Sequence, residues 1–119
     1  MELTAIELWA LSAAVAAWAP HSVGEIALAC KLLPELEFTE EERAAIGWRA
    51  VARADGAVVP LFQESAPVTR QFNDKRVSQL LNILREGIRS GIFRGQHAPF
   101  LYSLLTKLGW VPVEDDEWA

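Results

Sequence analysis

The sequence has little of the chemistry on which catalysis and metal binding depend. Its 119 residues include one cysteine, two histidines, one methionine and one tyrosine. Because Cys30 has no partner for an internal disulfide, the chain suits a reducing compartment, and we expect a cytoplasmic protein. Zinc needs three or four Cys or His ligands at paired spacings, which Cys30, His21 and His97 do not provide. The sequence therefore predicts no metal site.

Motifs of enzymes and cofactor-binding proteins are also missing. Neither histidine stands in a motif that would make it the base of a nucleophilic site, and we expect structural or solvent roles for both. No glycine-rich phosphate loop is present, since Gly87, Gly91 and Gly95 fit stop and turn positions around a helix end. The acidic cluster at 35–42 lacks the spacing of a calcium loop. We therefore expect no enzymatic activity and no cofactor.

Long apolar runs are absent as well. The Ala-rich stretch 6–19 is too short to span a membrane, and Glu2 and Glu7 stand where a signal peptide carries positive charge, so we expect no membrane partner. Apolar residues make up 51% and charged residues 23%, which is ordinary for one folded domain of this length. We expect that domain at 1–112 and an acidic tail at 113–119.

Three capping-box patterns mark helix beginnings in the first half of the chain. In each, a hydroxyl residue stands three positions before a glutamate: Thr4 and Glu7, Ser22 and Glu25, Thr39 and Glu42. An apolar-periodic run follows each box, which predicts helices at about 5–18, 23–33 and 40–46. The first helix is rich in alanine, which favours close packing by other helices and a central position.

The end and the buried face of the second helix follow from its own residues. We expect the helix to end at Leu33, because Pro34 disfavours helical geometry in the residue before it. Its apolar stripe would then consist of Ile26, Ala29, Cys30 and Leu33. This interpretation places Cys30 in the core.

A β-hairpin is expected at about 48–62. Asp55-Gly56 separates two segments of strand-like composition, and this dipeptide is the strongest short hairpin signal. Pro60 cannot donate to a ladder, so its strand should be an edge strand. A helical continuation through 48–54 is the alternative. A polar loop is expected at 63–71.

Two further helices are predicted in the second half of the chain. The longer, at about 74–90, has an apolar face made of Val77, Leu80, Leu81, Leu84 and Ile88. The shorter, at about 99–108, begins at a proline and stops before Gly109. The predicted fold class is mainly α (α+β): a compact five-helix domain with a small antiparallel hairpin after the third helix.

The face of helix 74–90 opposite its leucines is basic. A helical wheel places on this face Lys75, Ser78, Asn82, Arg85 and Arg89. Residues 70–107 contain seven Lys or Arg against two acidic residues, a net +5, whereas the whole chain is −5. A solvated helix face would look the same. The functional interpretation is a docking surface for an acidic protein or a phosphate backbone.

Five tryptophans are many for so short a chain. Trp9, Trp18 and Trp48 are expected in the core. Trp110 and Trp118 follow the last helix, close to the acidic tail, and exposed tryptophan is enriched at binding hot spots. Trp110 and Trp118 are therefore candidate partner-binding residues, although Trp118 would look the same in a tail without a function.

The order of three helices and a hairpin is also that of a winged-helix DNA-binding domain. The helix in the recognition position would begin with Glu40-Glu41-Glu42, which phosphates repel. Together with the net charge of −5, this disfavours nucleic acid as the partner. A nucleic-acid-associated regulator that uses the basic helix face is the first alternative function.

The segment order also resembles that of a group of small, mostly uncharacterised proteins of bacteriophages and prophages. The resemblance is carried by Leu3-Thr4, the helix from Glu25 to Leu33, the run Phe38-Thr39-Glu40-Glu41-Glu42, the hairpin, the long leucine helix and the segment Leu101 to Leu108. It implies an accessory protein of the host-cell cytoplasm that inhibits or modulates a host protein complex by binding it. It assigns no functional residue.

The sequence as a whole predicts a non-catalytic protein-binding module. Its candidate partner-binding residues are Lys75, Asn82, Arg85, Arg89, Trp110 and Trp118. A self-assembling structural protein is the second alternative, because the acidic first half of one copy could pair with the basic helix of the next.

Overall fold

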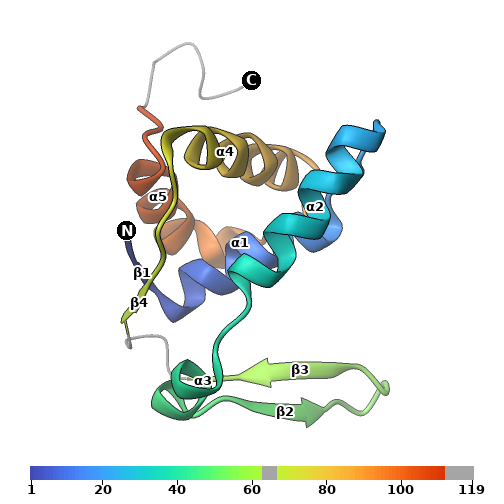
Figure 1. Cartoon of the computed structure of the whole chain (residues 1–119). Helices are drawn as coiled ribbons and strands as arrows, with labels where there is room; N and C mark the ends of the chain where they lie inside the picture. Colours follow the sequence, from blue (N-terminus) through green and yellow to red (C-terminus); the bar gives the residue numbers. More distant parts are fainter. Residues whose placement is uncertain (63–66, 112–119) are drawn as a thin grey trace.

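The computed structural model describes residues 1–62 and 67–111, and most of these residues are in helices (Figure 1). These residues form five α-helices: α1 (Ala5–Ala17), α2 (Val23–Leu36), α3 (Glu40–Ile46), α4 (Asp74–Arg89) and α5 (Ala98–Lys107). They also form two antiparallel pairs of strands: β1 (Glu2–Thr4) with β4 (Pro67–Thr69), and β2 (Arg49–Ala52) with β3 (Val58–Leu61). The predicted mainly helical α+β fold is confirmed.

Two of the three predicted capping boxes are complete. At the start of α1, Glu7 N donates to Thr4 Oγ1 at 3.2 Å and Thr4 N donates to Glu7 Oε1 at 2.8 Å. Thr39 and Glu42 form the same pair of bonds at the start of α3. Gly47 caps α3 with a left-handed backbone, φ +66°, as predicted.

The third box differs from the prediction by one residue. Ser22 Oγ accepts from Glu25 N at 3.1 Å, so Ser22 does cap α2. The Glu25 carboxylate, however, accepts from His21 N at 2.9 Å rather than from Ser22 N. One of the two bonds of the capping box is therefore formed, and the other is made to the residue before the N-cap.

Helix α1 lies at the centre of the molecule, as predicted from its alanines. It contacts α2, α4, α5 and both strands of the β1–β4 pair (Figure 1). Seven of its residues are buried: Ala5, Glu7, Leu8, Ala10, Leu11, Ala14 and Val15. The small side chains let the neighbouring helices approach on several sides. Trp9 and Trp18 are only partly buried, at the edge of this core.

Helix α2 runs one turn further than predicted. It passes through Pro34 and ends at Leu36, with Glu37 as its C-cap. Leu32 and Leu36 are 0% and 1% exposed, and burial of Leu36 in the core favours the extra turn over the local preference of a residue before proline. The prediction that Pro34 ends the helix is therefore wrong.

The predicted buried stripe of α2 is also wrong. Ile26, Cys30 and Leu33 are exposed, while Leu32 and Leu36 enter the core and Leu28 is partly buried. The inward face thus follows the spacing 28, 32, 36. Both faces of this helix are apolar, so periodicity alone did not distinguish the buried face from the exposed one.

The remaining helices lie close to their predicted positions. Helix α4 ends at Arg89 with Ser90 as its cap, and α5 begins one residue early, at Ala98. Leu80 and Leu84 are fully buried, whereas Ile88, predicted on the same face, is 37% exposed. Ile83 is buried instead. The side of α4 that faces the core consists of Leu80, Ile83, Leu84 and Gly87.

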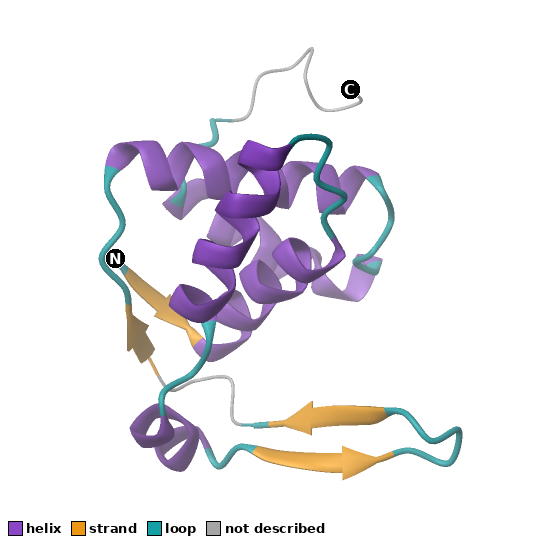
Figure 2. Cartoon of the chain, turned by 45° about the vertical axis from the view of Figure 1, so that its right-hand side comes forward, coloured by secondary structure: helices purple, strands orange, loops and turns teal. Residues whose placement is uncertain are grey.

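Residues 49–52 are a strand and do not continue α3. They pair with β3 in the register Arg49 to Leu61 and Ala52 to Val58, with Pro60 opposite Ala50. Gly56 adopts φ +86° in the turn, which favours glycine. Figure 2 shows the hairpin beside α3, extending along one end of the molecule. Trp48 is partly buried and stacks on Phe62 at 5.7 Å between ring centroids.

The β1–β4 pair lies partly where a polar loop was predicted. Leu3 pairs with Val68, and both side chains are buried, at 1% and 3% exposure. Three-residue strands are too short to show a period, and the paired residues are 63 to 67 positions apart in the sequence. The loop prediction is therefore wrong for 67–69, while 63–66 lie outside the described residues.

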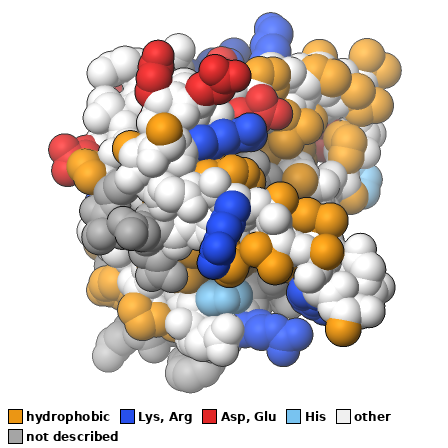
Figure 3. All heavy atoms as spheres, turned by 90° about the horizontal axis from the view of Figure 1, so that it is seen from below, with side chains coloured by type: hydrophobic (Ala, Val, Ile, Leu, Met, Phe, Trp, Pro, Cys, Tyr) orange, Lys and Arg blue, Asp and Glu red, His pale blue; other side chains and the backbone are white. Residues whose placement is uncertain are grey.

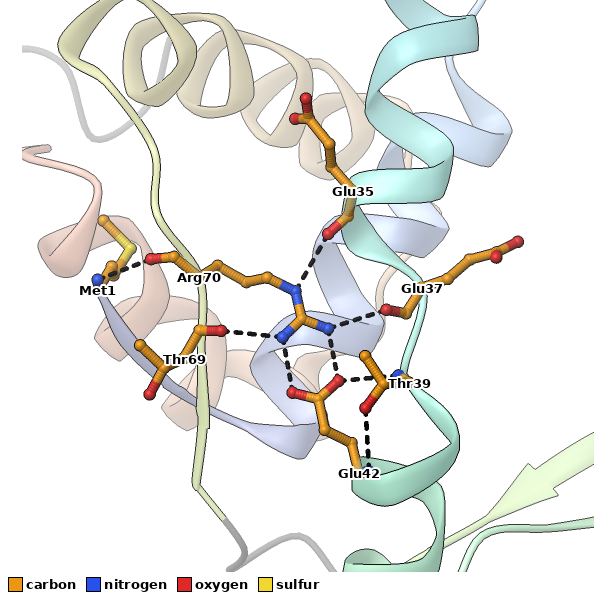
Figure 4. Close-up of polar contacts among 7 residues, drawn as sticks. All are labelled: Met1, Glu35, Glu37, Thr39, Glu42, Thr69 and Arg70. Atoms are coloured by element: carbon orange, nitrogen blue, oxygen red, sulfur yellow. Dashed lines mark hydrogen bonds and ion pairs between the residues drawn. The ribbon is translucent and has the colours of Figure 1, made fainter.

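Arg70, directly after β4, connects this strand to the end of α2 and the start of α3 (Figure 4). Its guanidinium donates to both carboxylate oxygens of Glu42, each at 2.6 Å, and to the backbone oxygens of Glu35 and Glu37. A further bond reaches the Thr69 oxygen at 2.9 Å. The hydrogen bonds from Arg70 are the main reason that the pKa of Glu42 lies below its usual value.

We expect Arg70→Lys to destabilise the protein by about 1–3 kcal/mol, although it keeps the charge. An ammonium group cannot reproduce a planar fork that donates to two carboxylate oxygens and three carbonyl oxygens. Urea unfolding measures the change. Arg53→Lys, in an exposed pair with Asp55, is the matched control. Equal stability of the two variants would contradict this role of Arg70.

A second ion pair joins α1 to α5. Glu7 is 1% exposed, and Lys107 Nζ donates to its Oε1 atom at 2.6 Å. The other carboxylate oxygen, Oε2, is buried without a hydrogen-bond partner in the described structure. Burial raises the pKa of Glu7, but the hydrogen bonds from Lys107 and Thr4 outweigh it, and the pKa lies below its ordinary value of 4.5.

Candidate interaction surface

Internal ion pairs use three of the seven basic residues between 70 and 107. Arg70 pairs with Glu42, and Lys107 pairs with Glu7. Arg76, near the start of α4, pairs with Glu35 of α2 at 3.2 Å. The net +5 counted in the sequence therefore overstates the basic charge that is available on the surface.

Three other basic side chains lie along the outer face of α4. Within residues 1–62 and 67–111, Lys75, Arg85 and Arg89 take part in no side-chain hydrogen bond or ion pair given by the structure. With Asn82 they form what we call the basic face, which covers about 21 Å at 1.5 Å per residue. Lys75, Asn82 and Arg89 are exposed and Arg85 is half-buried. Four of the predicted partner-binding residues thus lie together.

The second half of this face is hollowed. Asn82, Arg85, Glu86 and Arg89 line a shallow depression of about 270 Å³. The lining thus has one carboxylate, that of Glu86, and two guanidinium groups. The hollow can receive a carboxylate from a partner, because both arginines present donors there.

Of the two predicted tryptophans, the structure describes Trp110. Trp110 follows α5, and its ring packs edge-on against Tyr102 of the same helix, with centroids 5.9 Å apart. Trp118 lies outside the described residues. Trp110, which follows α5, and the basic face of α4 therefore belong to different segments of the chain.

Helix α2 presents a second surface, which the sequence analysis missed. Its outward side carries Val23, Ile26, Ala27, Cys30, Leu33 and Pro34, all exposed and none charged. The three largest aliphatic side chains among them are 83%, 52% and 37% exposed, for Val23, Ile26 and Leu33. We call this side of the helix the apolar face. In the sequence, α2 has apolar residues on both sides, and this pattern could have indicated an exposed apolar face.

Hydrophobic atoms are visible on the corresponding side of the molecule. In Figure 3 they gather in the upper right of the view, and the right-hand side is where α2 lies in Figure 1. Exposed apolar patches of this kind mark binding surfaces more often than isolated exposed side chains do.

The apolar face and the basic face meet in one depression. It is lined from α2 by Gly24, Ala27, Leu28 and Lys31 and from α4 by Asn73, Lys75, Arg76 and Gln79. Ala27 belongs to the apolar face and Lys75 begins the basic face, so the two surfaces are continuous there.

The two histidines have different surroundings. His97 lies among the rings of Trp9, Phe93 and Phe100, and its Nδ1 atom accepts from Arg94 N at 3.1 Å. His21 is exposed at the start of α2. In the part of the chain that the structure describes, no three His, Cys, Asp or Glu residues are grouped as a metal site would require.

Among the same described residues, no helix has both the length and the hydrophobicity to cross a membrane. No family model matches the chain, and comparisons with curated proteins and with solved structures gave no match. The resemblance to phage accessory proteins therefore stays a prediction.

Proposed function

We propose that this protein is a non-catalytic protein-binding module that docks an acidic partner on the basic face of α4. The observation that supports the proposal is that some basic residues form internal ion pairs and others do not. Arg70, Arg76 and Lys107 are used by internal ion pairs, while Lys75, Arg85 and Arg89 share one outer face without such partners in the described residues. Cations left without internal partners are the ones that an acidic surface can engage.

An acidic protein suits this surface better than a nucleic acid does. The chain carries −5 overall, and α3, the helix in the recognition position of a winged-helix domain, begins with three glutamates and is seven residues long. A nucleic-acid-associated regulator remains the alternative, and self-assembly the second. Following the resemblance, the proposed role is that of a phage-type accessory protein that inhibits or modulates a host complex.

We expect Arg85→Glu with Arg89→Glu to weaken partner capture at least about tenfold, because two attractive contacts become repulsive. The measurement is affinity capture from a nuclease-treated bacterial lysate, identification by mass spectrometry and titration of the purified partner. The matched control is Arg49→Glu with Arg53→Glu, the same charge change at two exposed hairpin residues.

Each outcome has a defined meaning. A protein retained by the wild type and the hairpin control, but lost by the α4 variant, supports the proposal. Equal retention by all three would contradict it. Capture that disappears with nuclease treatment would favour the nucleic-acid alternative, and a lower thermal unfolding temperature of the α4 variant alone would assign its arginines to the fold.

A further inference from the structure

We propose that the apolar face of α2 and the basic face of α4 together bind an amphipathic helix of another protein, one whose apolar stripe is bordered by carboxylates. This inference rests on the proposed function and names the partner class. The apolar face would provide the buried contact and the basic face its charged border.

The spacing of the apolar face suits a helix as the occupant. Val23, Ile26, Cys30 and Leu33 follow one another at intervals of three, four and three residues, the spacing of a helix–helix seam. Ala27 and Pro34 beside this row are small or compact, so a second helix can approach closely. Partner helices that dock in this way use anchors at the same i, i+3, i+7 spacing.

Charge complementarity selects an acidic helix. The border of the apolar face toward α4 carries Lys31 and Lys75, which line the same depression. Further along α4, Arg85 and Arg89 line a second depression together with one carboxylate, that of Glu86. A row of carboxylates beside the apolar stripe of the partner would meet these cations along one side. A second copy packed on the same face would instead bring its own cations to this border, where like charges repel.

The test uses the full chain, labelled with ¹⁵N, and two synthetic helical peptides. The first has leucines at i, i+3, i+7 and i+10 with glutamates beside them, and the second has lysine in place of each glutamate. We expect the acidic peptide to shift the amide resonances of Val23–Leu36 and Lys75–Arg89. The lysine peptide should bind at least about tenfold more weakly.

Variants of the apolar face separate this inference from the proposed function. Val23→Glu suits the first turn of α2, where the helix dipole favours a negative charge, so the fold should be kept. Together with Ile26→Glu it should abolish peptide binding. Val58→Glu with Leu61→Glu, at two hairpin residues that are 67% and 43% exposed, is the matched control and should change nothing.

Several results would overturn the inference. These are an absence of shifts, equal binding of the two peptides, or unchanged binding by the Val23→Glu and Ile26→Glu variant. Dimerisation of the free chain through α2, seen by light scattering and abolished by the same variant, would make a second copy the occupant. Binding of the face to phosphatidylserine vesicles but not to the acidic peptide would make it a lipid surface. The identified protein partner could still bind the Val23→Glu and Ile26→Glu variant but fail to bind the Arg85→Glu and Arg89→Glu variant. In that case the proposed function stands while the inference fails.

Discussion

Lys107→Met is expected to lower the free energy of unfolding by about 3 kcal/mol at pH 7. The substitution keeps the aliphatic packing of the lysine but leaves the carboxylate of Glu7, which is 1% exposed, without its charged partner. Glu7 Oε2 already lacks a hydrogen-bond partner in the described structure, so little there compensates the loss. The value is at the low end for broken buried pairs, because the Lys107 side chain is 34% exposed.

The pH dependence of this loss gives a second, independent signature. In the wild type the pKa of Glu7 lies below its ordinary value, so its contribution to stability is present above the unfolded pKa and is lost as the pH falls through the folded pKa. Without Lys107, burial dominates and raises the pKa of Glu7 above the unfolded value. Acidification then neutralises the buried charge, and the difference between variant and wild type should shrink from pH 7 to about pH 4.

Urea unfolding at the two pH values measures both effects. Lys107→Arg, which keeps the positive charge, is the control and should lose less stability. A loss below about 1 kcal/mol for Lys107→Met, or a loss that is independent of pH, would show that Glu7 is neutral or hydrated in the folded protein.

Leu84→Ala is expected to destabilise the protein by about 2–5 kcal/mol, because Leu84 is fully buried in the core between α4 and its neighbours. Leu81 provides the comparison. The sequence places both leucines on one apolar face, but Leu81 is only partly buried, so Leu81→Ala should lose about half as much or less.

Denaturant unfolding of the two alanine variants distinguishes them. The slope of the unfolding free energy against denaturant should stay the same in both, which shows that only stability has changed. Equal losses, or a loss under about 1 kcal/mol for Leu84→Ala, would contradict the orientation of α4 in the core.

Local signals account for most of what the sequence predicted about the fold. The Thr4 and Thr39 boxes, the Gly47 cap and the Asp55-Gly56 turn each act within a few residues, and each lies where it was expected. The central position of α1 also followed from composition, since alanine permits close packing on several sides.

What the sequence missed depends on contacts between distant segments. The β1–β4 pair and the bonds of Arg70 to Glu42 have no local pattern, and the last turn of α2 exists because Leu36 reaches the core. The same limit applies to the candidate site. The basic face of α4 was visible in the sequence, but only the structure separates Arg76, which pairs with Glu35, from Arg85 and Arg89.

The ion pair between Glu7 and Lys107 joins residues that are 100 positions apart, and α1 packs against helices from both halves of the chain. During synthesis, α1, which organises the core, is made before α4 and α5, which pack against it. The sides of α1 that pack on α4 and α5 are therefore covered only after these two helices have left the ribosome. A nascent chain arrested before residue 98 would lack α5, and the side of α1 that α5 covers would be exposed to chaperones and proteases.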